Sequence, residues 1–367
     1  MSENAGRSLR NRQKRRAALL PPRKTSYVTE STDSLAHTLQ GMILASEGEH
    51  TATLPKATLG DYLAISRPDH WFKNIFMLPG TALAAALSDT HLSSVSLLSL
   101  MVGITAVCLL SSANYTINEW FDAEFDRHHP LKKSRPSARG CIRGSLVSIQ
   151  WLAFASAGLV LSSLLSVQFF IFATALLIMG AIYNIHLIRT KDIPYLDVLS
   201  ESINNPLRFL LGWAIISSNT LPPSSILLAY WMGGAYLMAV KRYAEFRFIG
   251  NAALAGQYRR SFKYYSEESL LLSAFFYALS ATFFLGVFLI KYRVEFLLAI
   301  PFLALLFVWY LKIGMQKNSV TQKPERLYKE VHFILYVVFL TGLILLLFVV
   351  DMPWLNFLVE QTQLPFE

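Results

Sequence analysis

One stretch of the chain places a side-chain amide and two carboxylates at steps of four residues: Asn118, Asp122 and Asp126. Residues four apart share one face of a helix, so these side chains would form a single oxygen-rich stripe. The stripe ends a very apolar segment, and ionised groups at membrane depth usually face a cavity or a partner rather than lipid. Such oxygens beside cations suit a divalent metal that holds a diphosphate. The alternative is a solvated loop after a helix.

Cations flank this stripe on both sides. Lys132 and Arg135 follow it within the run from Arg127 to Pro136. Lys73 precedes the first apolar segment, at an expected helix start, and helix starts and cations both favour anions. These residues predict phosphate binding, and the alternative for Lys73 is an interfacial anchor together with a nearby tryptophan.

A second stretch repeats the pattern. Arg189 and Lys191 could donate to phosphate, and Asp197 and Glu201 repeat the four-residue carboxylate step. Two acidic stripes on different helices could hold one or two Mg²⁺ ions with a diphosphate between them. The alternative is a helix that begins at Pro194 and carries a stabilising acid in its first turns.

A third stretch contains Lys241 and Arg242, followed by the cationic and aromatic residues 258–265. It could also contact phosphate. Topology alone would place some cations in a cytoplasmic loop, so this stretch does not decide between the two interpretations.

The elements that position these residues are membrane helices. The chain has 367 residues, of which 53% are hydrophobic and 16% charged, whereas a soluble protein is about a quarter charged. We therefore predict an all-α, polytopic membrane protein. Its nine candidate spans lie near 73–90, 95–117, 146–164, 166–186, 195–216, 222–240, 268–290, 294–312 and 331–350. The fifth contains polar residues such as Asn204, Asn205 and Arg208, which favour a helix that lines a cavity.

The distribution of Lys and Arg predicts the orientation. Basic residues are concentrated in the N-terminal tail and in alternate connections, and the acidic end 351–367 has none. We therefore predict an integral protein of the cytoplasmic (inner) membrane. By the positive-inside rule its N-terminus is cytoplasmic and its C-terminus lies outside. The net charge of +9 is then explained by topology and phosphate handling, and no nucleic-acid partner is expected.

Three regions follow from the composition. Residues 1–58 are polar and basic and are expected to form a disordered cytoplasmic tail. The cluster Arg10–Arg16 either contacts anionic lipid head groups or serves only as a positive-inside signal. Residues 59–352 are expected to form the transmembrane region, and 353–367 a short extracytoplasmic tail. The two cysteines form no disulfide framework and have no metal-site spacing.

The motifs resemble those of a known family over residues 60 to 350. Asn118-x-x-x-Asp122-x-x-x-Asp126 with Arg135-Pro136 resembles the first signature of the UbiA-type intramembrane prenyltransferase superfamily, and Tyr183…Arg189-x-Lys191…Asp197 resembles the second. Three stretches are similar to a narrower branch, the decaprenyl-phosphate phosphoribosyltransferases: Arg67-Pro68-x-x-Trp71-x-Lys73-Asn74, Asp126-Arg127-x-His129-Pro130-x-Lys132 and Lys241-Arg242-Tyr243-Ala244-Glu245. Arg189-x-Lys191 is closer to the general superfamily pattern.

The resemblance implies about nine helices around a central cavity with a cytoplasmic polar cap. It implies transfer of 5-phosphoribose from phosphoribosyl diphosphate to a polyprenyl phosphate, with Asp122, Asp126 and Asp197 catalytic. Mg²⁺ would be held by Asn118, Asp122, Asp126 and Asp197. The substrate phosphates would be bound by Lys73, Lys132, Arg135, Arg189, Lys191, Lys241 and Arg242.

Two alternatives remain at this point. An aromatic prenyltransferase of the same superfamily would move a polyprenyl chain from its diphosphate to a ring. A transporter would place its polar residues at the membrane midplane within inverted repeats. The acidic stripes of this chain instead lie at one face of the membrane, and no inverted repeat is evident in the sequence.

Overall fold

The computed structural model describes residues 57–87, 94–129, 131–185, 188–292 and 294–358. Within these ranges the chain is helical and contains no strand, so the all-α prediction is confirmed. Of the predicted N-terminal tail, only residues 57 and 58 fall within the described ranges. The predicted C-terminal tail is described as far as the short helix η8 (Pro353–Leu358).

Six helical segments are long and apolar enough to cross a membrane, which supports the predicted multi-pass membrane protein. They belong to α5 (Ser94–Asp126), α6 (Gly144–Ser163), α7 (Val167–Asn184), α12 (Glu267–Tyr292), η5 with α13 (Val294–Ala299 and Ile300–Gly314) and α14 (Val331–Val349). The helix that contains the second predicted span, α5, continues beyond residue 117 to Asp126. No glycine or proline interrupts residues 104–129, so the first acidic stripe is a face of this same helix.

The other three predicted spans are helical, but they are not among the six apolar segments, and the count of nine spans is not confirmed. The first is the 3-10 segment η1 (Pro68–Met77) that leads into α4 (Leu78–Leu87). The fifth is divided at Ile203 into α8 (Leu196–Ser202) and α9 (Asn204–Ile216). The sixth, α10 (Ser224–Ile249), is long, but several charged residues occupy its C-terminal part.

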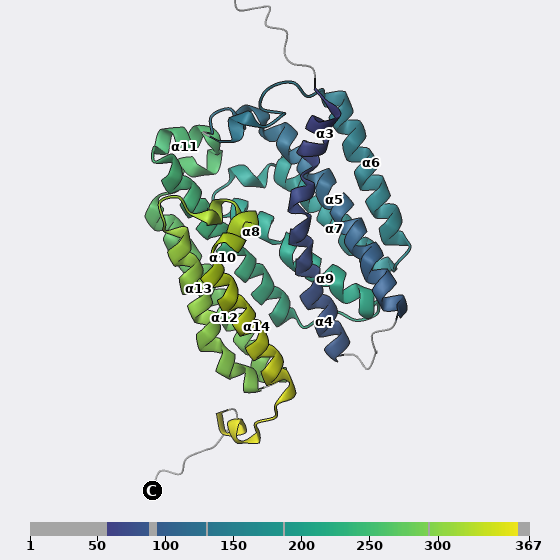
Figure 1. The fold of residues 1–367 in the computed structure, drawn as a ribbon, viewed down its shortest axis with the longest axis vertical. Helices are drawn as coiled ribbons and strands as arrows, with labels where there is room; N and C mark the ends of the chain where they lie inside the picture. Colours follow the sequence, from purple (N-terminus) through teal and green to yellow (C-terminus); the bar gives the residue numbers. More distant parts are fainter. Residues whose placement is uncertain (1–56, 88–93, 130, 186–187, 293, 359–367) are drawn as a thin grey trace, which may run out of the picture. The chain divides into compact units, whose positions relative to one another are not determined.

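Helices far apart in the sequence pack against one another (Figure 1). α5 packs against α6 and α7, α4 and α7 pack against α9, and α10 packs against α8 and α12. At the crossing of α4 and α9, a Cβ atom on Gly80 would collide with the carbonyl oxygen of Phe209, and one on Gly212 with that of Met77. Small residues permit such close approach between membrane helices. The crossing holds η1 beside α9.

Short polar helices connect the spans at one end of the bundle (Figure 1). They are α3 (Leu59–Ser66), η2 (Lys132–Ser134), η3 (Thr190–Asp192), α11 (Ala252–Tyr258), η4 (Arg260–Lys263), η6 (Val320–Gln322) and η7 (Pro324–Lys329). η3 contacts α8 and η4, and α11 contacts α5. These contacts bring cationic connections to the acidic end of α5.

Candidate active site

A polar cavity of about 780 Å³ lies among η1, α5, α8, α9 and α10. Eight of the eleven site residues predicted from the sequence line it: Lys73, Asn118, Asp122, Asp126, Lys132, Arg135, Lys241 and Arg242. The other three, Arg189, Lys191 and Asp197, lie behind the lining and are at most 4% exposed. The structure therefore brings all three predicted stretches to one cavity.

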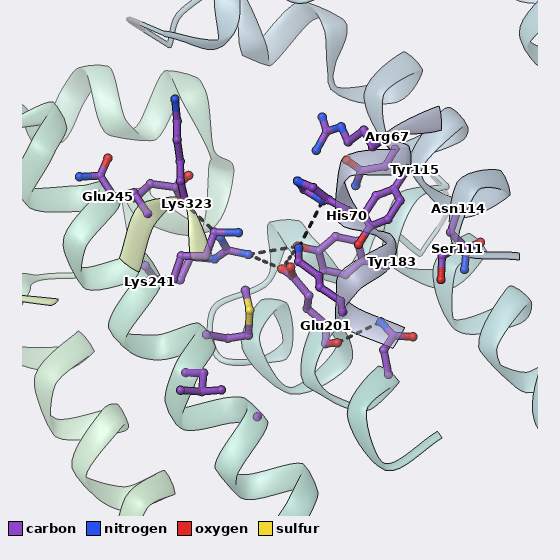
Figure 2. Close-up of a pocket in the computed structure, with 18 of the residues that line it drawn as sticks. Arg67, His70, Ser111, Asn114, Tyr115, Tyr183, Glu201, Lys241, Glu245 and Lys323 are labelled. Carbon is purple, nitrogen blue, oxygen red and sulfur yellow. Dashed lines mark hydrogen bonds and ion pairs between the residues drawn. The ribbon is translucent and has the colours of Figure 1, made fainter. Parts of the chain in front are cut away.

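Figure 2 shows how the walls of this cavity face each other. Lys241 and Glu245 lie on one side and Asn114 and Tyr115 on the other, with Glu201 between them. The first pair comes from α10, the second from α5, and Glu201 from α8. Three helices thus supply polar side chains to one space, and those of α8 and α10 include charges of both signs.

The first acidic stripe faces the cavity from α5. Asp122 accepts hydrogen bonds at Oδ1 from Lys191 Nζ (2.5 Å) and Arg189 Nη2 (3.0 Å). Asp126 accepts at Oδ2 from Arg135 Nη1 (2.6 Å). In the described part of the chain, the second carboxylate oxygens, Asp122 Oδ2 and Asp126 Oδ1, accept no hydrogen bond. Each carboxylate is therefore oriented through one oxygen while the other remains available.

The amide of Asn118 completes this stripe. Its Nδ2 donates to Asn184 Oδ1 at 2.7 Å, and the same Asn184 oxygen accepts from Lys191 Nζ at 2.8 Å. This donation fixes the orientation of the Asn118 amide and leaves its Oδ1 as an acceptor. Burial lowers the pKa of Lys191 to about 8, although the Asp122 carboxylate partly offsets the effect.

The oxygens of this stripe could bind a hard divalent cation only if substrate phosphates and waters supplied the remaining metal ligands. Among the described residues, no three His, Cys, Asp or Glu side chains form a group that could hold a metal by themselves. Mg²⁺ does not require such a cage, since it usually keeps several waters and binds one or two carboxylates plus substrate phosphates. The stripe supplies two carboxylate oxygens and one amide oxygen of this kind.

One guanidinium contacts both acids of the second stripe. Arg242, which is 1% exposed, donates to Asp197 Oδ2 (3.3 Å), Glu201 Oε2 (2.5 Å) and Glu245 Oε2 (3.2 Å). Asp197 also accepts from Tyr265 Oη at 2.7 Å. Arg242 thus compensates three carboxylates in the cavity wall. A metal role for Asp197 stays a prediction, and it would require this carboxylate to exchange its present partners.

The connection after α5 is also tied to α10. Lys132 Nζ donates to Glu245 Oε1 at 2.7 Å and contacts the Tyr258 hydroxyl. Burial lowers the pKa of Lys132, but Glu245, Tyr258 and Asp126 together outweigh burial and raise this pKa above its ordinary value. His129 Nδ1 accepts from the backbone N–H groups of Leu131 and Lys132 (3.1 and 3.2 Å). Burial and the nearby Lys132 lower the pKa of His129 to about 4, so its ring is neutral and can accept.

A further group of charges, here called the cavity cations, consists of Lys73, Arg208 and Lys241, which all line the cavity. None of them forms an ion pair with a carboxylate in the part of the chain that the structure describes. Lys73 Nζ lies 3.3 Å from His70 Nδ1. Arg208 donates from Nε to Asn74 Oδ1 at 2.9 Å. Cations that line a cavity without a direct ion-pair partner favour anionic ligands.

Arg208 is the cavity cation that the motifs do not include. In the sequence it is recognisable only as an arginine within the otherwise apolar residues 206–216. Ionisable residues inside membrane segments are commonly functional, and this is the signal that could have identified it. The motif positions drew attention to the ends of helices, whereas Arg208 lies within α9.

Two cavity-lining amides have unsatisfied oxygens. Asn114 Nδ2 donates to the Leu176 carbonyl (3.0 Å) and Asn204 Nδ2 to the Glu201 carbonyl (2.9 Å), which fixes the orientation of both amides. Both Oδ1 atoms are buried and accept no hydrogen bond from the described residues. Because buried polar atoms are normally paired, these oxygens favour a ligand that brings hydrogen-bond donors.

A second cavity of about 1250 Å³ adjoins the polar one. Its lining is mostly apolar and comes from α4, α9, α10, α12, α13 and α14. The two cavities share seven lining residues: Phe76, Asn205, Gly234, Leu237, Leu306, Tyr310 and Phe333. An amphipathic ligand could therefore place its polar group in one cavity and its apolar chain in the other.

Comparisons with known proteins agree with this arrangement. A model of the UbiA prenyltransferase family matches residues 76–334. The decaprenyl-phosphate phosphoribosyltransferase of Mycolicibacterium smegmatis is 27% identical over 245 residues, which cover 65% of this chain and 72% of the relative. The protein of the same name from Mycobacterium tuberculosis is 28% identical over 239 residues, covering 64% and 74%.

The structural comparison concerns the fold. A UbiA homolog from Archaeoglobus fulgidus, solved with GPP and Mg²⁺, superposes with a TM-score of 0.59 at 20% identity. The match covers 77% of this chain and 99% of that one. The predicted UbiA-like fold is thereby confirmed.

Proposed function

This chain belongs to the UbiA prenyltransferase family, and we propose that it transfers 5-phosphoribose from phosphoribosyl diphosphate to a polyprenyl phosphate, with release of diphosphate. The cavity cations carry this proposal. The proposed substrates bring a 5-phosphate and a lipid phosphate in addition to the diphosphate. A prenyl diphosphate and an aromatic acid would bring the diphosphate and one carboxylate, and so no second phosphate. The name of the curated relatives supports the same choice.

The unsatisfied amides support a sugar substrate. Asn114 Oδ1 and Asn204 Oδ1 need hydrogen-bond donors. A ribosyl group supplies donors through its hydroxyls, whereas an ionised prenyl diphosphate has only acceptors. Hydroxyl groups held by these amides would also orient the ribose toward the acidic stripe, and such positioning is a large part of catalysis.

In the proposed reaction the bond between ribose C1 and the diphosphate oxygen breaks, and its electron pair leaves with the diphosphate. An oxygen of the lipid phosphate forms the new bond to C1. This oxygen is already anionic, so the reaction requires no general base. The oxygens of Asn118, Asp122 and Asp126 would hold Mg²⁺, which when bound neutralises charge on the departing diphosphate.

In this proposal some of the surrounding cations hold the carboxylates of the acidic stripe, and Arg242 holds the carboxylates of the opposite wall. Arg189 and Lys191 hold Asp122 from behind the lining, and Arg135 holds Asp126. Arg242 fixes the carboxylates of the opposite wall, and so maintains the shape of the site. The adjoining apolar cavity would accept the polyprenyl chain.

The test is turnover by the purified full chain in lipid nanodiscs. Radiolabelled phosphoribosyl diphosphate, a polyprenyl phosphate and Mg²⁺ should yield a labelled lipid and free diphosphate. The matched control is the polyprenol of the same length, which lacks the phosphate and should yield no product. If these substrates give no product, but a prenyl diphosphate and an aromatic acid give a prenylated ring, the aromatic prenyltransferase alternative is correct.

A further inference from the structure

Arg208 lies close to the boundary between the two cavities. It is 8% exposed and lines the polar cavity. The next residue on α9, Phe209, lines the apolar cavity, and Asn205, one turn earlier, lines both. The head group of an amphiphile whose chain lies in the apolar cavity would therefore come near this guanidinium.

The partners of Arg208 are neutral. Its Nε donates to Asn74 Oδ1 at 2.9 Å, and its Nη1 to the Asn204 carbonyl at 3.3 Å. Ser111 Oγ donates to the same Asn74 oxygen at 3.3 Å. These bonds use two of the five donors of a guanidinium. Within the described residues no carboxylate compensates this buried charge, which is costly at membrane depth without an anion.

We propose that Arg208 binds the phosphate of the polyprenyl phosphate acceptor and so selects an anionic lipid over a neutral one. This inference rests on the proposed function and assigns one of its substrates to a residue. The diphosphate would be held at the acidic stripe, at the end of α5, whose oxygens would hold Mg²⁺. The lipid phosphate, which arrives with its chain in the apolar cavity, meets Arg208 at the boundary.

A purely structural role is the alternative, since the bond to Asn74 also links α9 to η1. Two variants separate these roles. Arg208→Gln can still donate a hydrogen bond to Asn74 but has no charge. Asn74→Asp keeps an acceptor for Arg208 and adds the counter-charge that the guanidinium lacks. Asn74 is 2% exposed and is not part of the cavity lining, so it would act on the ligand through its neighbours. Its polar neighbours are Arg208, Ser111 and Cys108, and of these only Arg208 is charged.

The Michaelis constants of the full chain in nanodiscs provide the first test. Arg208→Gln and Asn74→Asp should each raise KM for polyprenyl phosphate about 10- to 100-fold, which corresponds to about 1.4–2.8 kcal/mol. KM for phosphoribosyl diphosphate should not change, and Arg208→Lys should show a smaller rise. The matched control is Arg247→Gln, because Arg247 pairs with Glu267 (3.4 Å) outside the cavity lining. It should behave as the wild type.

Binding without turnover distinguishes this inference from the proposed function. A polyprenyl phosphate, with no second substrate, should raise the thermal unfolding midpoint of the wild type more than the matching polyprenol does. Arg208→Gln and Asn74→Asp should abolish that difference. If the difference depends on Arg208 but the wild type does not transfer phosphoribose, the proposed function is wrong and the inference stands.

Three results would overturn the inference. The first is that both variants bind polyprenyl phosphate as the wild type does. The second is a rise in KM for phosphoribosyl diphosphate alone, which would assign Arg208 to the 5-phosphate. The third is that Arg208 is required for binding an aromatic carboxylic acid but not for binding polyprenyl phosphate. If Arg208→Gln does not fold, Asn74→Asp still decides between these outcomes.

Discussion

Replacing Lys73 with methionine should weaken substrate binding and leave the stability of the fold unchanged. The same change at Lys132 should weaken substrate binding and also lower the stability of the fold. Methionine keeps most of the length of the side chain and removes its charge. Lys73 contacts His70 at 3.3 Å and lies 5.8 Å from the centre of the Tyr115 ring. Lys132, in contrast, pairs at 2.7 Å with Glu245, whose side chain is 2% exposed.

These contacts give the magnitudes. Loss of one charge-assisted bond between Lys73 and a substrate phosphate costs about 1.5–3 kcal/mol, or roughly 10- to 150-fold in KM. The cation–π contact with Tyr115 contributes about 0.5–1 kcal/mol to stability. Removing one partner of a buried pair costs about 3–5 kcal/mol. For Lys132 we expect the lower end, since Arg242 still lies 3.2 Å from Glu245.

The assay combines KM values for both substrates with thermal unfolding midpoints in the same nanodiscs. Lys73→Met should raise KM for one phosphate-bearing substrate with little change in the midpoint, and Lys132→Met should lower the midpoint clearly. The reasoning is refuted if Lys73→Met lowers the midpoint as much as Lys132→Met does and leaves both KM values unchanged. A wild-type midpoint for Lys132→Met would refute the pairing with Glu245.

Four further predictions follow from the site and the topology. Asp122→Asn and Asp126→Asn should each abolish turnover in a folded protein, because an amide lacks the charge that Mg²⁺ needs; near-normal activity in either variant would exclude the metal site. A reporter at the C-terminus should read as extracytoplasmic and one within 250–258 as cytoplasmic, and a cytoplasmic C-terminus would contradict the orientation. A well-inserted chain without residues 2–55 should keep its turnover; loss of activity would show that the tail takes part in catalysis. His129 has a pKa of about 4 in the folded chain and an ordinary value of 6.5. Between these pH values the unfolded chain therefore binds more protons at His129 than the folded chain does. The free energy of unfolding should therefore decrease as the pH falls through this window, and His129→Asn should flatten that dependence in denaturation measured at several pH values.

Local spacing was sufficient to predict the first acidic stripe. Helical periodicity alone places Asn118, Asp122 and Asp126 on one face, and the structure shows that face lining a cavity. The polarity of the fifth predicted span likewise indicated a cavity-lining helix, and Glu201, Asn205 and Arg208 do line it. Both predictions depend on residues within a few turns of one another, so they required no knowledge of tertiary contacts.

The pairing of charges could not be predicted in this way. Lys241 and Arg242 are neighbours and were assigned the same phosphate-binding role, yet Arg242 contacts three carboxylates and Lys241 belongs to the cavity cations. The difference depends on α8, whose Asp197 meets Arg242 only after the two helices pack. A hydropathy pattern shows that two helices are buried, but it does not show which of their faces meet.

This division of charges also explains how an acidic stripe can persist in a cationic cavity. Asp122 and Asp126 are each paired through a single oxygen, and these pairs orient the carboxylates before any ligand arrives. A divalent cation could bind the second oxygens without displacing Arg135, Arg189 or Lys191. The same pairs use part of the positive charge near the stripe, so the cavity cations, which have no ion-pair partner among the described residues, remain for further phosphates. Such an arrangement would keep the diphosphate and the lipid phosphate at separate places in one cavity, which transfer of a ribosyl group between them requires.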